Sequence, residues 1–386
     1  MTMEERKKSK LRRIVKVVCI IATIFISALL VVSAYGGLVE PTKTSIFAFI
    51  TLTFPFLLGL TLFIAFLWFI VLRWRVALIP LVAVAVSWPV VRTVSPLNIT
   101  SHKITAREDS TKFTVLSYNV MNFEKKNALT HFEGARTLQY IMESNADVVM
   151  LQEGSLSIDI NNLPLLKPYM KEFKKRYPYR SHGYHDQVIL SKHPYTAVED
   201  STIKEGFASP DEPLSMYHFY ARAYDVLVPG HTVRFINLHL SSMMLSQEDV
   251  KAYVDITNLN DQPTRRELST MRHSVMTKIS LAFKKHAQEA RIIRHVIDQS
   301  GENVIVCGDF NDVPMSFTYR TIKGDDMRDA YSDCAFGPVN TFRDNRLYFK
   351  IDHILYRGDM KAVDCRVDKK GDSDHYPQIA TFVWKN

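Results

Sequence analysis

Cysteine is scarce in this sequence, and its scarcity excludes several kinds of protein. The 386 residues include 4 cysteines, too few for a small domain held together by a disulfide framework. Cys334 and Cys365 could pair in an oxidising compartment, and the sequence alone does not decide whether they do. The chain also lacks internal repeats and low-complexity tracts, which excludes solenoids, repeat arrays and collagen-like fibres.

Acidic residues are rare at the start of the chain. Residues 1–100 contain 3 of them against 11 lysines and arginines. Because the whole chain has 48 basic and 40 acidic residues and a net charge of +8, residues 101–386 hold 37 of each and are neutral overall. The positive charge is therefore no sign of a basic groove that would bind long nucleic acid, although nucleic acid stays open as a partner.

Long apolar runs fill most of this first part. They cover Val17–Gly37, Ser45–Leu72 and Val76–Val91. The first run follows a basic segment, is long enough to cross a bilayer and exceeds the apolar core of a typical signal peptide. The third run is shorter and contains two prolines, so the number of spans stays open. We expect a basic tail over residues 1–13 and a membrane region of about three helices over residues 14–95.

The basic residues predict how these spans are oriented. A basic cluster precedes the first run, and Arg73 and Arg75 lie between the second and the third. Such residues stay on the cytoplasmic side, so three crossings would place the rest of the chain outside the cytoplasm, and two would leave it inside. We expect a multi-pass protein of the cell membrane with an extracytoplasmic soluble part. Residues 98–100 match a glycosylation sequon, which only a eukaryotic secretory host would use.

Residues 104–386 have the composition of a globular domain, in which apolar strands alternate with polar loops. Helices are predicted at Phe132–Asn145 and Leu268–Gln299. Strands are predicted at Phe113–Val120, Asp147–Gln152, Gln187–Leu190, Tyr217–Val226, Thr232–Leu240, Asn303–Cys307, Asp352–Tyr356 and Gln378–Val383. Because so few helices separate the strands, we expect an α/β domain of two packed mixed sheets and no regular βαβ winding.

A carboxylate and a carboxamide end one of these strands, the apolar run that begins at Val304. Gly308 lets the backbone turn there, and side chains at i and i+2 of an extended segment point the same way. We therefore expect Asp309 and Asn311 to project into one cleft. An acceptor and an amide donor held together suit a metal-bound phosphate and its attacking water.

Other polar side chains also follow apolar strands, and each one alone is a weak signal. Taken together they would face one rim of the two packed sheets. They are Asn119, Glu153, His239, Asp352, Asp374 and His375.

The order Asn, Glu, His, Asp-x-Asn, Asp and Asp-His resembles the endonuclease/exonuclease/phosphatase superfamily. Its members include pancreatic-type deoxyribonucleases and neutral sphingomyelinases. The resemblance covers residues 104–386. It implies a four-layered α/β sandwich of two packed mixed sheets, with a divalent-metal phosphoesterase site in the cleft between the sheets.

The resemblance also implies a role for each residue of this set. The metal ligands would be Glu153, Asn119 and Asp374, holding Mg²⁺ with Mn²⁺ as the alternative ion. The catalytic residues would be His239, Asp309, Asn311, Asp352 and His375, of which Asn311 and His239, together with Asn119, would also bind the substrate. Asp309 and Asn311 would orient the attacking water, and His239 would protonate or stabilise the leaving oxygen. His375 would contact the scissile phosphate, with Asp352 hydrogen-bonded to its ring and favouring the imidazolium.

Two features depart from the family pattern. Lys350 stands before Ile351 and Asp352 where an arginine is usual, and the loop Gly183–Gln187 lacks the common small residues. We expect both to lie near the substrate rim and to bear on which substrate is used.

These observations predict a membrane-anchored, Mg²⁺-dependent phosphoester hydrolase that acts outside the cytoplasm. We rank a lipid head group or a small phosphodiester slightly above nucleic acid as the substrate, because the soluble part is neutral and the expected membrane tether favours substrates at the membrane surface. The alternative is a membrane-bound nuclease of the same superfamily. An alternative of another class is an inactive, membrane-attached binding module, which the intact polar set opposes. No obligate protein partner is evident.

Overall fold

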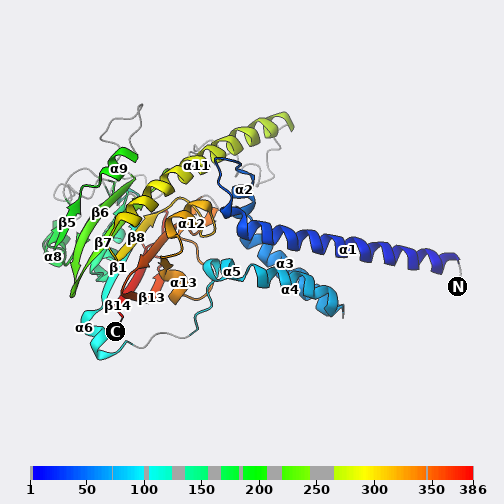
Figure 1. Cartoon of the computed structure of the whole chain (residues 1–386), viewed down its shortest axis with the longest axis horizontal. Coiled ribbons are helices and arrows are strands. Elements are labelled where there is room, and N and C mark those ends of the chain that lie inside the picture. The colour runs from blue at the N-terminus through cyan, green and yellow to red at the C-terminus, as the bar shows by residue number, and fades with distance from the viewer. Residues whose placement is uncertain are drawn as a thin grey trace. The chain divides into compact units, whose positions relative to one another are not determined.

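The computed structural model describes residues 3–71, 73–99, 104–123, 135–154, 167–181, 186–206, 220–243, 265–344 and 347–385 (Figure 1). The chain forms two compact units. One comprises Met1–Val94 with Met315–Phe317, and the other comprises Ser95–Pro314 with Thr318–Asn386. We describe each unit separately. The division into a tail, a membrane region and a catalytic domain at residues 13, 95 and 104 remains a prediction.

The first unit is helical. Its elements are α1 (Met3–Tyr35), η1 (Gly36–Leu38), α2 (Ile46–Leu52), α3 (Phe54–Ile70), α4 (Trp74–Val86) and α5 (Trp88–Val94). Among the described residues, one helix, Met3–Leu38, is by itself long and apolar enough to cross a membrane. The pairs α2–α3 and α4–α5 each reach that length only together, and they are bent by 58° and 65°. By length and composition, the described residues of this unit therefore offer one candidate span, or up to three if each bent pair is one span.

Prolines explain both bends. Pro55 lies at the start of α3 and Pro89 at the start of α5. A proline lacks the backbone N–H that would continue the preceding helix and disfavours helical backbone in the residue before it. The second apolar run is therefore broken at Thr53, where the sequence predicted one continuous span.

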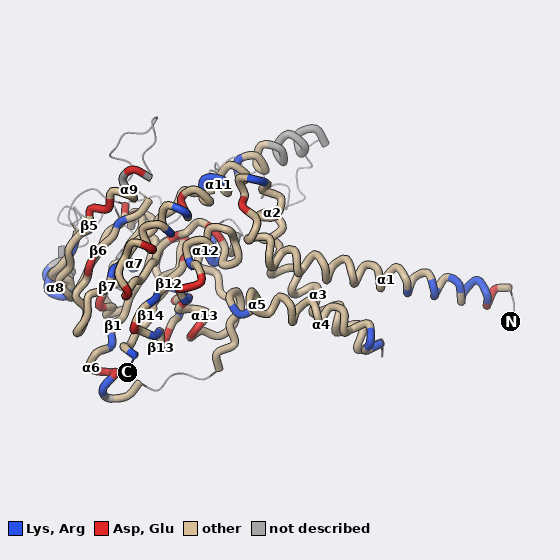
Figure 2. The backbone as a smooth tube through the Cα atoms, viewed as in Figure 1, with Lys and Arg blue, Asp and Glu red and all other residues tan. Residues whose placement is uncertain are grey.

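Large apolar side chains cover the outside of this unit. Phe25, Phe56, Phe63, Phe66 and Val82 are all more than half exposed, although such side chains are usually buried in soluble proteins. Figure 2 shows lysines and arginines gathered in the first turns of α1 and almost absent from the rest of that helix. An apolar exterior with charge at one end suits a lipid environment.

The second unit contains two six-stranded sheets and a hairpin. The first sheet is built from β1 (Phe113–Asn119), β2 (Val148–Gln152), β3 (Tyr179–Arg180), β4 (Val188–Ser191), β13 (Met360–Val367) and β14 (Gln378–Trp384). The second is built from β5 (Tyr195–Val198), β6 (Ala221–Val228), β7 (His231–His239), β8 (Val304–Asp309), β9 (Arg328–Asp329) and β12 (Asp352–Arg357). The hairpin comprises β10 (Phe342–Asp344) and β11 (Leu347–Phe349).

Both sheets are mixed. The first has the order β13-β14-β1-β2-β4-β3, and the second has the order β5-β6-β7-β8-β12-β9. The pairs β1–β2 and β7–β8 are parallel. The pairs β1–β14 and β8–β12 are antiparallel. Each parallel pair lies at the centre of its sheet. The ends of β1, β2, β7 and β8 carry or adjoin the polar residues of the candidate site.

Helices cover the outer face of each sheet. The helices that the described residues of this unit form are α6 (Ala106–Thr111), η2 (Met121–Phe123), α7 (Ala135–Ser144), α8 (Lys167–Arg176), α9 (Ser201–Gly206), α11 (Arg265–Gln299), α12 (Phe317–Lys323) and α13 (Ala330–Cys334). On the first sheet, Ile141 of α7 and Phe173 of α8 pack against β1 and β2. On the second, Ile293 and Ile297 of α11 and Ile322 of α12 pack against β7 and β8. The result is a four-layered α/β sandwich.

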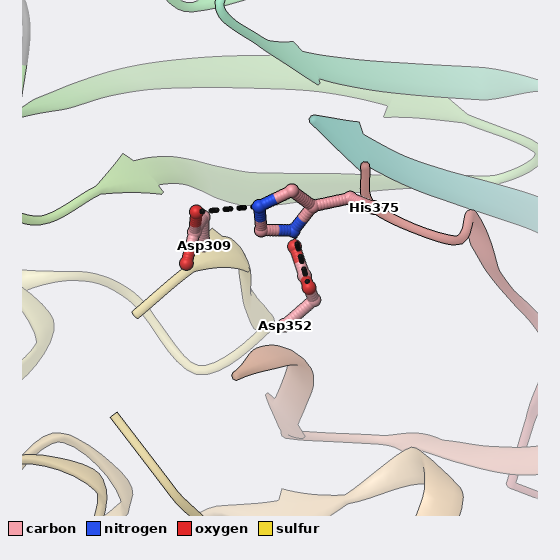
Figure 3. Close-up of side chains that lie close together, drawn as sticks. All are labelled: Asp309, Asp352 and His375. Carbon is pink, nitrogen blue, oxygen red and sulfur yellow. Dashed lines mark hydrogen bonds and ion pairs between the residues drawn. The ribbon is translucent and has the colours of Figure 1, made fainter. Parts of the chain in front are cut away.

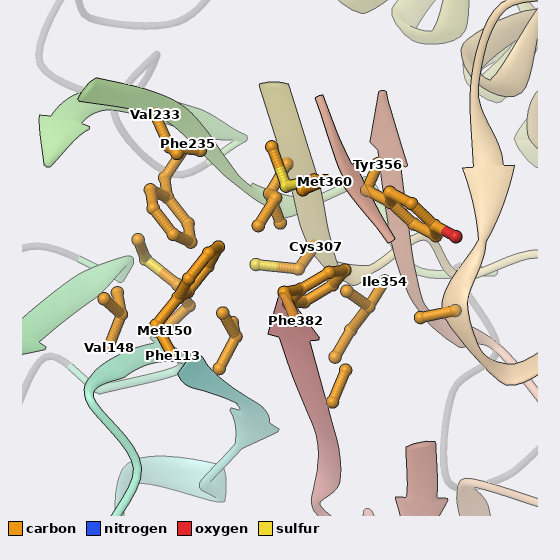
Figure 4. Packing of buried hydrophobic residues seen from close by; sticks show 14 of the residues in the cluster. Phe113, Val148, Met150, Val233, Phe235, Cys307, Ile354, Tyr356, Met360 and Phe382 are labelled. Carbon is orange, nitrogen blue, oxygen red and sulfur yellow. The ribbon is translucent and has the colours of Figure 1, made fainter. Parts of the chain in front are cut away.

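A single apolar core lies between the two sheets (Figure 4). Phe113 and Met150 from the first sheet meet Phe235 and Cys307 from the second. Along β8, Cys307 faces this core whereas Val306 faces α11. Because both faces of β8 are buried, its sequence is continuously apolar instead of alternating.

The predicted fold class is confirmed, and the two long helices and the central strands lie close to their predicted bounds. The helix predicted at Phe132–Asn145 is α7 within the described residues, since residues 132–134 lie outside them. The first residues of the strand predicted at Tyr217–Val226 likewise lie outside the described part, and the strand continues to Val228. The strands β3, β5, β9, β10, β11 and β13 were not predicted.

Candidate active site

Three polar side chains come to the same edge of the second sheet because their strands are in register. His239 on β7 is paired with Asp309 on β8, and Asp309 is paired with Asp352 on β12. Each of the three is the last or first residue of its strand. The sequence placed all three at strand ends, and the register explains why they meet.

Gly308 allows β7 and β8 to approach closely at this edge. Its φ is +137°, a backbone conformation that residues other than glycine rarely adopt. A Cβ atom at this position would lie 2.0 Å from the carbonyl oxygen of Leu238. No other residue fits here without moving the end of β8, and Asp309 is the next residue.

His375 is held between two carboxylates, as Figure 3 shows. Its Nδ1 lies 2.9 Å from Oδ2 of Asp352 in a hydrogen bond, and its Nε2 lies 3.5 Å from Oδ2 of Asp309. The hydrogen bond from His375 to Asp352 is the one expected from the sequence. All three side chains are buried. Buried charges that are paired in this way keep a fixed geometry.

The charges in this cluster shift one another's pKa values. Burial alone would lower the pKa of His375, but Asp352 and Asp309 outweigh it and raise that pKa to about 10. Burial and the neighbouring Asp352 raise the pKa of Asp309 to about 6, against the opposing effect of His375. For Asp352 burial favours a higher pKa, but the imidazolium of His375 holds the pKa below its usual value. His375 is therefore a cation at neutral pH.

Asn119 and Glu153 reach the same edge from the first sheet. The Asn119 side-chain amide donates hydrogen bonds to Oε1 of Glu153 at 2.9 Å and to Oδ2 of Asp309 at 3.2 Å. Asn119 ends β1, and Glu153 follows β2 with a left-handed φ of +52°. One amide thus joins a carboxylate of each sheet, so the site spans the boundary between the two sheets.

His239 has a partner that the sequence did not identify. Its Nδ1 lies 2.7 Å from Oδ2 of Asp186, and its Nε2 lies 3.8 Å from Oε1 of Glu153. Burial lowers the pKa of His239, but Asp186 chiefly, with Asp309 and Glu153, raises it to about 9. Asp186 belongs to the loop expected at the substrate rim, of which residues 183–185 lie outside the described part. The one hint of this contact in the sequence was that the loop departs from the family pattern.

Asn311 lies close to Asp309 for a reason other than the one predicted. The strand ends at Asp309, and Asn311 has a left-handed φ of +50°, so the two side chains do not project together from an extended segment. The Asn311 backbone N–H donates to Oδ1 of Asp309 at 2.8 Å, and its amide donates to the carbonyl of Leu240 at 2.9 Å. Asn311 therefore links the ends of β8 and β7.

Asp374 lies at the edge of this cluster. Its carboxylate accepts a hydrogen bond from the Ser373 hydroxyl at 3.3 Å, and its charge helps to raise the pKa of the adjacent His375. Ser373 also donates to the carbonyl of Asn119 at 2.7 Å. This bond ties the segment that carries Asp374 and His375 to the end of β1.

Lys350 does not lie at the substrate rim, and that expectation was wrong. The residue is 5% exposed. Its amino group donates to Nδ1 of His353 at 2.8 Å and lies 3.5 Å from Oδ2 of Asp329. Because a buried carboxylate is costly without a cation beside it, the side chain turns inward to Asp329.

The helix α11 holds the loops that follow β7 and β8. The Ser241 backbone N–H donates to Oε2 of Glu289 at 3.2 Å, and its carbonyl is hydrogen-bonded to His286. His286 Nδ1 also lies 3.8 Å from Oδ2 of Asp312. These contacts are buried, and they connect one helix to the two loops adjoining His239 and Asn311.

The donors at this edge fit a hard divalent cation. Asp309, Asp352 and His375 bring potential ligand atoms within 4.8 Å of one another. Both ring nitrogens of His375 face carboxylates, however, and this favours a protonated imidazolium over a neutral imidazole that could bind a metal. Glu153 is different, because 31% of its side chain is exposed. Carboxylate oxygens are ligands that Mg²⁺ prefers, and Glu153 supplies one next to Asp309. The Asn119 amide presents its nitrogen to both carboxylates, and its oxygen accepts from the Met121 N–H, so Asn119 would bind a metal only with its amide turned.

Comparison with known families and structures gave the following matches. A family model described as the endonuclease/exonuclease/phosphatase family matches residues 116–375. A model for a domain of unknown function matches residues 13–94. No curated protein matches the chain.

Solved structures similar to this chain include three with low sequence identity. An endonuclease/exonuclease/phosphatase family protein from Bacteroides thetaiotaomicron is 17% identical over 72% of this chain and 99% of its own, with a TM-score of 0.44. A truncated TDP2 from Caenorhabditis elegans is 16% identical over 71% and 98%, with a TM-score of 0.43. A mannosyl-6-phosphatase from Bacteroides thetaiotaomicron is 15% identical over 70% and 100%, with a TM-score of 0.41.

Proposed function

We propose that this chain, which belongs to the endonuclease/exonuclease/phosphatase family, is a membrane-anchored, divalent-metal-dependent phosphoester hydrolase. In the reaction that we propose, water attacks phosphorus. The observation that supports this most directly is the meeting of Asn119, Glu153 and His375, which lie at or beside the ends of β1, β2 and β14 of the first sheet, with Asp309 and Asp352 of the second. Acceptors for the attacking water and donors for the phosphate lie at one edge.

Asp309 would orient the attacking water. It is a buried carboxylate whose Oδ1 is already occupied by the Asn311 backbone N–H and whose Oδ2 faces Asn119 and His375. Its raised pKa makes it a stronger base than an exposed aspartate. Asn311 keeps this carboxylate in place and could turn its own amide to the phosphate once the substrate displaces its bond to Leu240.

His375 would stabilise the charge that develops on the phosphate oxygens. Its raised pKa keeps it cationic, and Asp352 fixes the orientation of the ring. A preorganised cation in a site shielded from water stabilises a developing negative charge better than one in solution. Asp352 acts through His375 and is in this sense a positioning residue.

His239 would serve the leaving oxygen. Its pKa of about 9 keeps it protonated at neutral pH, so it can donate a proton to the departing alkoxide or phenolate. The hydrogen bond to Asp186 fixes the ring by its Nδ1 and leaves Nε2 on the side of Glu153.

The residues that would hold the metal are Glu153 and Asn119, with Asp374 at the edge of the cluster. A bound Mg²⁺ or Mn²⁺ would supply Lewis-acid polarisation of the phosphoryl group. The choice between these ions, like the role of each ligand, is part of the proposal.

We propose a lipid head group or a small phosphodiester as the substrate. The neutral charge of residues 101–386 offers no general attraction for long nucleic acid. The apolar first unit would keep the domain at a bilayer, where lipid head groups are concentrated. With three spans the domain would lie outside the cytoplasm.

The test is turnover by the full-length protein in nanodiscs, with Mg²⁺ or Mn²⁺. The panel comprises an aryl phosphodiester, sphingomyelin, phosphoinositides, nucleotides, RNA and DNA. We expect hydrolysis of the aryl phosphodiester and of at least one lipid or nucleotide, abolished by a chelator and restored by the metal. Salt-dependent cleavage of DNA with no action on lipids would replace the proposal by a nuclease. Binding without turnover of any phosphoester would leave a binding module.

A further inference from the structure

Three large apolar side chains are exposed together at the start of the second unit. Leu97 and Phe336 are neighbours in an isolated antiparallel β-bridge, and they are 50% and 65% exposed. Ile99, two residues beyond Leu97, is 85% exposed. We call Leu97, Ile99 and Phe336 the juxtamembrane patch. Exposed apolar groups gathered in this way usually mark a surface that is covered by something else.

The backbone under this patch is firmly held. The Gly337 N–H donates to the carbonyl of Pro96 at 2.7 Å, and the Asn98 N–H donates to the carbonyl of Ala335. The Asn98 side-chain amide donates to the carbonyls of Ser332 and Ala335, at 3.0 and 2.9 Å. The patch is therefore a fixed part of the second unit and is not a floating linker.

These hydrogen bonds also bear on the glycosylation sequon. The nitrogen of Asn98 that a glycan would modify is used twice to hold the fold. A glycan on this nitrogen would replace one of its two hydrogens and so break at least one of these bonds, which makes Asn98 a poor acceptor in the folded chain.

The position of the patch along the chain indicates what covers it. The last helix of the first unit, α5, ends at Val94 and has Arg92 in its last turn. Leu97 is three residues beyond Val94, and three residues span at most about 11 Å. The polar layer on each side of a bilayer is about 5–8 Å thick. If α4 and α5 together form a span, the patch lies within reach of the bilayer surface whatever the orientation of the second unit.

The chemistry of the patch agrees with lipid as its partner. It is made of leucine, isoleucine and phenylalanine and contains no ionisable group, whereas protein interfaces of the non-obligate kind have about as much polar area as the rest of a surface. On β9 and α13, the charges of Arg328 and Asp333 are paired with each other at 2.8 Å. Apolar and aromatic side chains at a bilayer surface bury their area among the acyl chains.

We infer that the juxtamembrane patch inserts into the surface of the bilayer in which the first unit is embedded. This inference rests on the membrane anchoring proposed above. Insertion of the patch adds an attachment to the places where the chain passes between the units, at residues 94–95, 314–315 and 317–318, and so restricts how the hydrolase domain can rotate at the surface. The patch thereby holds the domain in one orientation toward phosphoesters that lie in the membrane plane.

The test is photo-crosslinking in the full-length protein. p-Benzoylphenylalanine replaces Ile99 or Phe336, one position at a time, in membranes that contain radiolabelled phosphatidylcholine. Control positions are Leu227 and Tyr179, which are 53% and 40% exposed and lie on β6 and β3. We expect lipid adducts at residues 99 and 336 at least tenfold above those at residues 227 and 179.

Three outcomes would overturn the inference. Equal lipid labelling at test and control positions would mean that the patch has no special contact with the bilayer. Crosslinks from residue 336 to protein would identify a partner protein or a second copy as the occupant. Release of the chain from membranes by alkaline carbonate would remove the premise of anchoring instead. Unchanged turnover of a soluble aryl phosphodiester by each variant shows that the domain is folded.

Discussion

At the scale of single residues, the two imidazoles of the site have different carboxylate partners and therefore different tasks. His375 is held by Asp352 and Asp309, and it lacks an exposed side. We expect His375→Ala to lower kcat on an aryl phosphodiester by about 10²–10³, the effect of removing one preorganised donor. His295→Ala is the matched control, because His295 is exposed on α11. A kcat within tenfold of the original protein would contradict the assigned role.

The pair of Asp186 and His239 predicts a pH effect. Burial lowers the pKa of His239 and the carboxylates raise it to about 9, so the protonated form is lost, and activity falls, as pH rises through about 9. Removing the charge of Asp186 removes a raising influence. We therefore expect Asp186→Asn to move the alkaline limb of the kcat profile to lower pH by about 1–3 units. If the alkaline limb of the kcat profile stayed at the same pH, another group would control it. The control variant is Asp225→Asn, because Asp225 is paired with Arg234.

Residue contacts also show what the sequence could and could not predict about the site. The strand-end positions of Asn119, Glu153, Asp309 and Asp352 follow from apolar runs that stop at a polar residue, and this is visible in one dimension. The contact between Asp186 and His239 joins the loop before β4 to the end of β7, far apart in the sequence, so it depends on how these two strands are placed. The left-handed turn at Asn311 was also invisible, because asparagine adopts either backbone conformation.

At the scale of secondary-structure elements, the end of β8 depends on one glycine. Gly308→Ala would combine the strained φ of +137° with a Cβ 2.0 Å from the Leu238 carbonyl. We expect the variant to lose at least about 1–3 kcal/mol of unfolding free energy from backbone strain alone, seen as a lower Tm of the full-length protein in detergent. Gly301→Ala is the control, because nothing lies within 4 Å of its added Cβ. Equal Tm values for the two variants would contradict this account.

The junction of β9 and β12 contains a buried ion pair whose effect depends on pH. Burial favours a higher pKa for Asp329, but Lys350 and His353 hold it below its usual value. A depressed carboxyl pKa contributes stability that is present above the unfolded-state pKa of about 3.9 and is lost as pH falls through the folded-state value. We expect Asp329→Asn to cost about 3–5 kcal/mol at pH 7, since it leaves Lys350 buried without a counter-charge.

The measurement is denaturant unfolding of the full-length protein and of the Asp329→Asn variant between pH 7 and pH 3. The difference between the two should shrink as pH falls below about 4, because the unfolded chain of the original protein then binds a proton at Asp329 while the folded carboxyl, with its lowered pKa, stays ionised. A difference that stayed constant with pH would show that the loss arises from packing and not from charge.

The strands β3, β5, β9 and β13, which the sequence did not reveal, each lack a clear alternation of buried and exposed side chains. β3 and β9 have two residues each, too short for any alternation to be recognised. β5 is half-exposed throughout, at the edge of its sheet. β13 has a register shift between Ala362 and Asp364, and such a bulge interrupts the alternation that would otherwise reveal a strand. The central strands were predicted because both of their faces are buried.

At the scale of the whole molecule, the unsettled quantity is how many times the first unit crosses the membrane. We propose three crossings, with each bent pair as one span. A protease added to intact cells should then digest the second unit while the basic start of α1 stays protected, and digestion should require no permeabilisation. If the second unit were protected from the protease in intact cells and digested only after permeabilisation, the number of crossings would be even. A cytoplasmic marker protein, protected throughout, shows that the cells are sealed.

The placing of β14 has a consequence for how the protein is made. The last strand of the chain pairs with β1, the first strand of the second unit, and His375 lies just before it. A chain synthesised only as far as β13 therefore has neither a complete first sheet nor the imidazole of His375. The proposed hydrolytic site can form only after β14 has been made.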